Sequence, residues 1–371
     1  MEWKTVKLGE ILNFRRGHDL PHSEMKQGDI PVAGSNGCIG FHNVATPIAP
    51  IITIGRSGNI GTPYYYEKAW AHNTTLYIDD FKGNNPKYLY YLLKTLPLSA
   101  YTGGSAVPTL NRNHIHPLEI LHIEDKATQD KIVAILSSLD DKIENNNRIN
   151  RNLEAQAQAL FNSWFVDFEP WGGTMPEDWK EGHAEEFFTI NIGKTPPRKE
   201  KEWFTHDNRN CKWVSISDMA TCGTFISDSS EYLTQKAVDK FNIVMVPKDS
   251  ILLSFKLTIG RVAIAQTGLT TNEAIARFIL PKPIYREYLY LLLKKYNYSQ
   301  LGSTSSIATA VNSRIIKSMS MVMPTEEVLR MFNTTAKPLF EQIANNQREN
   351  TRLAALRDTL LPKLMKGEIE L

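Results

Sequence analysis

Basic and amide side chains lie beside glycines and polar turns in two separate parts of the sequence. Arginine in a loop can hold guanine through two hydrogen bonds or grip a phosphate, lysine mostly grips phosphate, and asparagine can read adenine. We therefore predict contact with nucleic acid. The candidate side chains are Arg15, Arg16, Asn36, Arg56 and Arg112 in the first part and Lys194, Arg198, Lys199, Lys256, Arg261 and Asn272 in the second. The alternative for each residue taken singly is a solubilising charge or a turn former.

Motifs that would run a reaction or hold a cofactor are incomplete in this sequence. Gly193-Lys194-Thr195 resembles the end of a phosphate-binding loop, but Phe188 stands where that loop needs its first glycine, and two prolines follow where a helix must begin. The glycines of residues 55–61 have the wrong spacing for a dinucleotide fingerprint. His114 and His116 have no cysteine or acidic cluster beside them. We therefore predict no catalytic residue, no metal site and no cofactor in this chain, which by itself is not an enzyme.

Length and composition are those of a two-domain globular protein. The chain has 371 residues, of which 42% are hydrophobic and 22% charged, and no apolar stretch could span a membrane. Its three scattered cysteines fit neither a disulfide framework nor a zinc ribbon, and the sequence opens with neither a signal nor a transit segment. These features favour a cytoplasmic protein in a reducing environment, without a membrane partner.

Charge is distributed unevenly along the chain. Residues 1–123 carry 11 basic and 9 acidic side chains, and residues 179–323 carry 19 and 13, whereas residues 124–178 carry 5 and 11. Contact with nucleic acid is therefore favoured in the two mildly basic regions and disfavoured along the acidic one.

The elements that must position the candidate side chains follow from a pattern that occurs twice, at an offset of 200. Apolar and asparagine residues recur at alternating steps of four and three, which is the seam of a helix that pairs with another helix. Asparagine at a seam position weakens a coiled coil but fixes its register. The predicted seam residues are Ile132, Leu136, Leu139, Ile143, Asn146, Asn150, Leu153, Leu160 and Trp164 in the first copy and Leu339, Ile343, Asn346, Asn350, Leu353, Leu360 and Leu364 in the second.

Two features disturb this seam. Ala157 and Arg357 occupy the same position of the two copies and do not match. Pro338 cannot sit inside a helix without a kink, so we expect the regular second helix to begin near Pro338, with residues 332–337 forming a separate turn. Asp125 or Thr128 can cap the first helix.

The regions before the two helices repeat as well. The matching segments are Trp3-Lys4 with Trp179-Lys180, Asn59-Ile60-Gly61 with Thr258-Ile259-Gly260, Asn73 with Asn272, residues 88–93 with residues 288–293, and, loosely, residues 104–107 with residues 302–307. Between these anchors the two copies scarcely resemble each other. A shared scaffold with divergent loops suggests two modules that do the same job on different targets.

The predicted fold class is α+β, with a pseudo-two-fold internal repeat. Two mixed α/β domains occupy residues 1–123 and 179–323, and we call them the first and the second domain. Long helices at residues 124–168 and 324–371 pair with each other as a coiled-coil spacer, and residues 169–178, rich in glycine and proline, form a linker.

The assembled pattern resembles the specificity subunit of type I restriction–modification systems over essentially the whole chain. Residues 17–21 with residues 30–37 look like the opening of one target-recognition domain, and residues 192–198 look like the opening of another. The most specific signature is the close of the second helix, residues 350–365. Any one of these phrases is moderate evidence, but in this order, and twice, they are strong.

The resemblance implies a non-catalytic subunit whose two target-recognition domains are separated by two antiparallel helices. Such a subunit docks two methyltransferase subunits and, through them, ATP-dependent motor-nuclease subunits. S-adenosylmethionine and ATP with magnesium would belong to those partners. The competing hypothesis is a duplicated scaffold or adaptor that holds proteins and never touches DNA.

Overall fold

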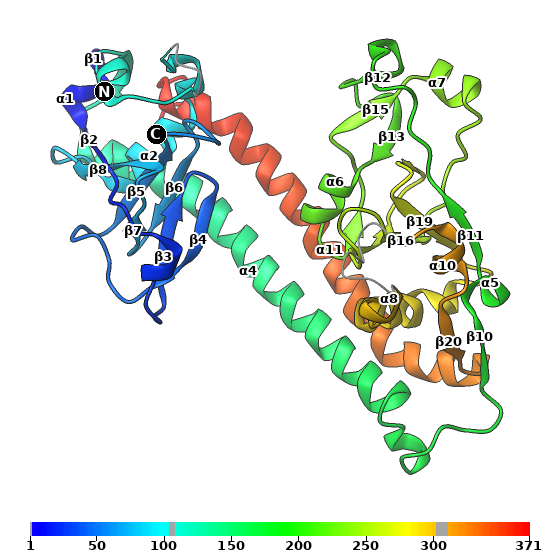
Figure 1. Cartoon of the computed structure of the whole chain (residues 1–371). Helices are drawn as coiled ribbons and strands as arrows, with labels where there is room; N and C mark the ends of the chain where they lie inside the picture. The colour runs from blue at the N-terminus through cyan, green and yellow to red at the C-terminus, as the bar shows by residue number, and fades with distance from the viewer. Residues whose placement is uncertain (1, 104–107, 302–310) are drawn as a thin grey trace. The chain divides into compact units, whose positions relative to one another are not determined.

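The computed structural model describes residues 2–103, 108–301 and 311–371, and the chain divides into two compact units (Figure 1). The first unit contains Met1–Glu144 with Asn350–Leu371, and the second contains Asn145–Glu349. The loose echo between residues 104–107 and 302–307 lies outside the described residues. Each unit is a mixed α/β domain completed by parts of two long helices.

The first unit contains a four-stranded sheet, a three-stranded sheet and a closing pair of strands. The four-stranded sheet is antiparallel throughout and has the order β2 (Asn13–Arg16), β8 (Thr75–Asp80), β5 (Ile51–Gly55), β6 (Pro63–Tyr66). The three-stranded sheet has the order β4 (Gly37–His42), β3 (Ile30–Gly34), β7 (Trp70–Ala71), and β1 (Trp3–Lys7) pairs with β9 (Glu119–Ile123). The helices are α1 (Leu8–Ile11), α2 (Pro86–Lys94), α3 (Arg112–Ile115) and the 3₁₀ turns η1 (His22–Glu24) and η2 (Leu98–Tyr101).

The second unit has a five-stranded sheet, a four-stranded sheet and its own closing pair. The five-stranded sheet has the order β11 (Thr189–Ile192), β19 (Ile275–Ile279), β16 (Ile251–Ser254), β17 (Val262–Ala265), β14 (Phe225–Ile226). The four-stranded sheet has the order β12 (Phe204–Thr205), β15 (Glu231–Leu233), β13 (Cys211–Val214), β18 (Thr270–Thr271), and β10 (Lys180–His183) pairs with β20 (Ser320–Met323). The shorter helices are α5 (Ala184–Phe187), α6 (Ile216–Thr221), α7 (Gln235–Lys240), α8 (Arg286–Lys295), α10 (Ser313–Lys317) and the turns η3 (Glu169–Trp171), η4 (Lys201–Trp203), η5 (Pro283–Tyr285) and η6 (Tyr298–Leu301).

The two units share one strand order, which confirms the predicted fold class and internal repeat. The order β2-β8-β5-β6 recurs as β11-β19-β16-β17, and the closing pair β1–β9 recurs as β10–β20. In both units the central strand is fully buried, because strands flank it on both sides and a helix covers one face: Ile52 and Ile54 pack with α2, and Ile251 and Leu253 pack with α8. Asn85 caps α2 by accepting hydrogen bonds from the backbone of Lys87 and Tyr88, as its position before a proline predicts.

The two long helices are α4 (Lys126–Phe165) and α11 (Glu326–Met365), each of 40 residues. Asp125 caps α4, since its carboxylate accepts hydrogen bonds from the backbone N–H and the hydroxyl of Thr128. The prediction that α11 begins near Pro338 is wrong, because residues 332–337 continue the helix. Pro338 lies on the exposed face, where water can hydrate the carbonyl group that loses its intrahelical donor.

In each unit the segments of α4 and α11 run antiparallel. In the first unit, Ile132 and Leu136 share a hydrophobic cluster with Leu361 and Leu364. In the second unit, the Asn346 amide donates a 2.8 Å hydrogen bond to the side-chain oxygen of Asn150. The residue numbers of facing pairs add up to nearly the same value in both units, as they must in an antiparallel pair. Every residue predicted for the seam is buried or half-buried. None of the helices in the described part of the chain is long and apolar enough to cross a membrane.

The segment predicted as a linker packs through aromatic rings. Phe168, with a φ of 53°, ends the helical path, and the Trp171 ring lies edge-on to Trp164 (5.6 Å between centroids) and to Trp179 (5.0 Å). These contacts fix the entry of the chain into β10.

Candidate nucleic-acid interface

In both domains the chain crosses itself closely just after the first strand of the main sheet. The backbone N–H of Gly17 donates to the carbonyl of Thr75 (3.0 Å), and the N–H of Gly193 donates to the carbonyl of Ile275 (3.2 Å). A methyl group added at Gly17 would place its carbon 2.1 Å from the His72 carbonyl oxygen, and one at Gly193 would lie 2.0 Å from that of Asn272. Only glycine allows this approach. It brings three loops together at one end of each sheet: the loop after the first strand, the loop before the last strand (residues 72–74 and 272–274) and the β5–β6 or β16–β17 loop.

The loop between β5 and β6 in the first domain has the same frame as the loop between β16 and β17 in the second. In the first domain the N–H of Gly61 donates to the carbonyl of Gly55 (2.8 Å), and in the second the N–H of Gly260 donates to that of Ser254 (3.0 Å). Residue 58 is a glycine with a φ of 78°, and its counterpart at an offset of 199, Leu257, has a φ of 63°. The loops therefore share a backbone and differ in the side chains that they present.

In the first domain the turn that carries Asn36 lies beside the loop that begins at Arg56. A methyl group at Gly58 would come within 3.2 Å of the Ser35 hydroxyl, and one at Gly55 within 3.2 Å of the Ser35 carbonyl oxygen. Asn36 is exposed at the tip of the β3–β4 turn, and Arg56 is half-buried. The structure thus brings these two candidates together, on loops of two different sheets.

Arg15 and Arg16 form the exposed end of β2. Their position is fixed by hydrogen bonds to the backbone of Phe14, the residue before them. The N–H of Phe14 donates to Nε2 of His116 (3.1 Å), and the Phe14 carbonyl accepts from the guanidinium of Arg112 (3.2 Å). Burial lowers the pKa of His116, and the nearby charges of Arg112 and Lys82 lower it further, so the ring stays a neutral acceptor. Arg112 is exposed, and its guanidinium helps to fix the backbone that precedes Arg15 and Arg16.

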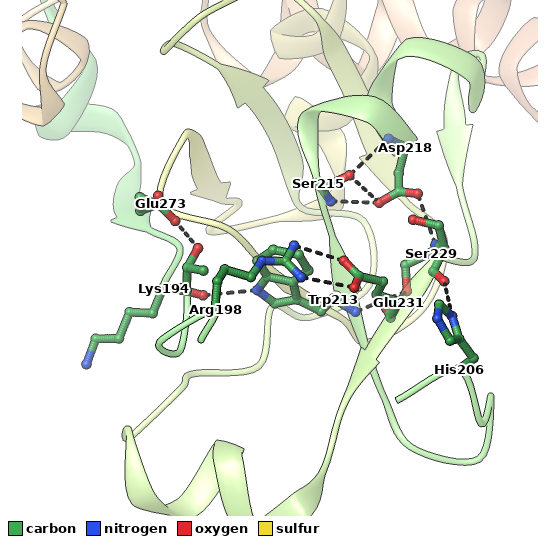
Figure 2. Close-up of polar contacts among 11 residues, drawn as sticks. Lys194, Arg198, His206, Trp213, Ser215, Asp218, Ser229, Glu231 and Glu273 are labelled. Carbon is green, nitrogen blue, oxygen red and sulfur yellow. Dashed lines mark hydrogen bonds and ion pairs between the residues drawn. The ribbon is translucent and has the colours of Figure 1, made fainter. Parts of the chain in front are cut away.

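In the second domain Trp213 pins the segment that carries Lys194 and Arg198 (Figure 2). The indole N–H of Trp213 donates to the Lys194 carbonyl (3.0 Å), and the Arg198 guanidinium lies over the Trp213 ring, 4.5 Å from its centroid. Arg198 also forms two hydrogen-bonded contacts with the Glu231 carboxylate, at 2.9 and 2.8 Å. Its charge is thus balanced and its donors are partly used, which weakens its case as a base-reading side chain.

Three more candidates of the second domain also make internal contacts. The Lys194 ammonium donates to the carbonyls of Phe241 (3.2 Å) and Asn242 (3.3 Å), although it stays exposed. The Arg261 guanidinium donates to the carbonyl of Ile216 (2.8 Å), and the Asn272 side-chain oxygen accepts from the backbone of Ala274 (3.1 Å). Arg261 and Asn272 therefore shape loops.

The remaining candidates are exposed cations. Arg15 lies 3.9 Å from Asp79, a distance at which an exposed ion pair is weak. Arg16, Lys199 and Lys256 are exposed and have no hydrogen-bond or ion-pair partner among the residues that the structure describes. Lys256 follows the buried Phe255 ring, with its ammonium 5.7 Å from the ring centroid. Arg16, Lys199 and Lys256 can therefore reach phosphates without first breaking a hydrogen bond or an ion pair.

Leu257 belongs to this interface and was missed by the reasoning from sequence. Its side chain is 83% exposed at the tip of the β16–β17 loop. The signal that could have found it is the repeat itself, because Leu257 aligns with Gly58 directly before the matched segment of residues 59–61 and 258–260. Within the described ranges, no group of three or more histidine, cysteine or acidic side chains could hold a metal ion.

The chain is similar to known proteins over most of its length. Residues 1–155 and 176–328 match the family model described as the type I restriction modification DNA specificity domain. The type I restriction enzyme HindI specificity subunit of Haemophilus influenzae is 27% identical over 360 residues, covering 76% of this chain and 77% of that protein. The MjaIX specificity subunit of Methanocaldococcus jannaschii is 30% identical over 306 residues, covering 76% and 69%.

A solved structure has the same fold. The crystal structure of the type I restriction–modification S subunit from M. genitalium aligns with a TM-score of 0.59 at 16% sequence identity, covering 98% of this chain and 96% of that one. The alignment spans both mixed α/β domains and both long helices.

Proposed function

This chain belongs to the family of type I restriction–modification DNA specificity domains, and from that premise we propose how it reads DNA. Each domain reads one half of a bipartite target through the loops that gather at the end of its main sheet. The observation that supports this best is the repeated glycine crossing, which assembles the same three loops twice and gives them different side chains. Because the loops differ, the two half-targets differ.

The helix pair would set the unread spacer between the half-targets. A helix of 40 residues is about 60 Å long, since each residue adds about 1.5 Å. The layer of Asn150 and Asn346 favours one alignment of the two helices, which is what a ruler requires.

The chain would act as the non-catalytic member of a larger cytoplasmic complex. Methyl transfer and DNA cleavage would be carried out by two methyltransferase subunits and, through them, by motor-nuclease subunits, to which S-adenosylmethionine and ATP with magnesium would belong. A duplicated surface supports two copies of one partner. In the second unit, the exposed Arg148 donates to Asn145 (3.0 Å), and Arg348 donates to Asn345 at the same positions of the other helix.

Exchanging the first domain tests this proposal. We expect that replacing residues 1–123 by the corresponding segment of another family member changes one half of the target and leaves the other half unchanged. The core positions facing the helices, such as Leu89 and Leu93, should be kept, because they pack with residues outside the exchanged segment. The readout is the methylated sequence, mapped by sequencing DNA from cells that carry the chain with its methyltransferase. A change in both halves contradicts independent reading.

A binding measurement distinguishes the proposed function from the competing proposal, a scaffold that never touches DNA. With the methyltransferase present, a DNA-reading subunit binds duplex DNA with an affinity that falls steeply as salt rises, because condensed counterions are released. Absence of salt-dependent duplex binding by that complex favours the scaffold.

A further inference from the structure

Leu257 is a large apolar side chain held in water by its own backbone. It is 83% exposed, and its φ of 63° lies in the left-handed region that bulky residues rarely adopt. Its counterpart in the first domain is Gly58, which takes the same conformation without strain. Neither solubility nor stability favours leucine at such a position, and strained backbone of this kind is concentrated at sites that bind ligands.

The loop around Leu257 is a fixed frame. The buried hydroxyl of Ser254 donates to the carbonyl of Thr258 (2.6 Å) and accepts from the backbone N–H of Arg261 (3.1 Å). The Arg261 guanidinium is in turn bonded to the carbonyl of Ile216. Because these hydrogen bonds fix both ends of the loop, the leucine is held facing the solvent. Little conformational entropy of the backbone is then lost on binding.

The surroundings of Leu257 are polar and cationic. The N–H of Phe255 donates to the carbonyl of Ala274 (2.9 Å), and the N–H of Lys194 donates to the carbonyl of Thr271 (2.9 Å), so the loop and the Lys194 segment meet at the same turn. Lys256 precedes the leucine and is exposed. An exposed apolar side chain beside a lysine suits a partner that is anionic overall and has small apolar groups.

We propose that Leu257 reads a thymine in the half-target of the second domain by contact with its 5-methyl group. In the major groove the edges of the bases present hydrogen-bond donors and acceptors, and the thymine methyl is the apolar feature that a leucine can recognise. Lys256 holds a neighbouring phosphate. This inference rests on the proposed function. The first domain, with Gly58 at the same place, makes no such contact, which contributes to the difference between the two half-targets.

The test replaces each thymine of the mapped target, one at a time, by deoxyuridine, which lacks the methyl group. The probe is the duplex target, and the protein is the full chain in complex with its methyltransferase. For the wild type we expect one thymine in the half-target of the second domain whose replacement weakens binding about threefold to fivefold, the value for burying one methyl group. With Leu257→Gly, thymine and deoxyuridine duplexes should bind equally, and the thermal midpoint should not fall, because glycine relieves the strain.

Two further variants distinguish the loss of the leucine side chain from other effects of substitution. Leu257→Asn, which tolerates the left-handed backbone but is polar, should also lose the thymine dependence. Val244→Ala removes another apolar side chain, which is 59% exposed and lies outside this loop. This control variant should keep the thymine dependence of binding. If the wild type binds the duplex but its thymine dependence persists in Leu257→Gly, or the half-target has no T·A pair, this inference alone is overturned. If the wild-type complex shows no salt-dependent binding, the proposed function itself fails.

Discussion

The Arg357 guanidinium donates a 2.7 Å hydrogen bond to the carboxylate of Asp140 and so joins α11 to α4 in the first unit. The Tyr91 hydroxyl donates to the other oxygen of the same carboxylate (2.7 Å). At the repeat positions the second unit has Ala157 and Phe340, which are both fully buried in one hydrophobic cluster. An ion pair in one unit thus replaces an apolar pair in the other, and this explains why Ala157 and Arg357 break the sequence repeat.

Removing one partner of this ion pair should cost more than removing both. Arg357→Ala leaves the Asp140 carboxylate, 29% exposed, without its cation, and we expect a loss of about 1–3 kcal/mol in the free energy of unfolding. Asp140→Phe combined with Arg357→Ala installs the apolar pair of the second unit and should recover part of that loss, because the Tyr91 hydroxyl then lacks its acceptor. Urea unfolding of the four chains of this double-mutant cycle measures the coupling. A double variant less stable than Arg357→Ala would contradict the equivalence of the two pairs.

The asparagine layer should behave as a device for register. Asn346→Leu alone deprives the Asn150 oxygen of its donor inside the helix pair, and we expect it to destabilise the chain by about 1–2 kcal/mol. Asn150→Leu with Asn346→Leu should be at least as stable as the wild type, because an apolar seam packs better. Its methylated targets should show more than one spacer length. A single unchanged spacer would argue that other contacts set the register.

Lengthening both helices should lengthen the spacer. Seven residues inserted after Arg148 and seven after Arg348 preserve the seam and add about 10 Å, which is about three base pairs. The two half-targets should stay the same. Sequencing of the methylated DNA measures the spacer, and insertion into one helix only is the control, since it should abolish modification. An unchanged spacer after the double insertion would rule out the helices as the ruler.

Exposed and internally bonded cations should affect DNA binding in different ways. Replacing Lys199 and Lys256 by glutamine should lower the slope of log affinity against log salt by about two, because each lysine would neutralise one phosphate. Arg112→Met and Arg261→Met should leave that slope unchanged and lower the thermal midpoint, because their guanidinium groups hold backbone carbonyls. A reduced slope in Arg261→Met would place that residue on a phosphate.

Stability should fall in mild acid through His116. The native state keeps this histidine neutral by burial, whereas the unfolded chain takes up its proton below the ordinary pKa of 6.5. The contribution of this histidine to stability is therefore complete above that value and is lost as the pH falls below it. In His116→Gln, whose side-chain oxygen can still accept from Phe14, the loss should be smaller. His114→Gln, an exposed histidine of the same segment, is the control, and parallel pH curves for wild type and His116→Gln would contradict this role.

The alternation of seam residues was readable from sequence because helix pairing depends on a local period and on residue type. The constant offset between the two copies shows which residues are equivalent, but only the structure shows that Asn150 faces Asn346 across an antiparallel pair. The predicted start of the second helix near Pro338 was wrong because a proline disrupts a helix only through one missing donor and one steric clash. On an exposed face of the helix both costs are small.

The roles of single cations could not be read from sequence. Arg112 and Arg198 look alike as basic residues near turns, and only the fold decides that one bonds the carbonyl of Phe14 and the other the carboxylate of Glu231. These partners are 98 and 33 residues away, so no local pattern encodes them. The same reasoning explains Leu257, whose exposure depends on a hydroxyl group buried beneath it.

The division of the chain into units has a consequence for its biosynthesis. Leu361, Leu364 and Met365 lie in the same hydrophobic cluster as Ile52 and Leu89. A ribosome therefore releases the first domain long before the side chains that complete its interior have been made, whereas residues 145–349 form one uninterrupted stretch. The part translated later can fold first, so the order in which the two units fold reverses the order in which they are translated, and the apolar interior of the first domain stays incomplete until residues 361–365 have been made.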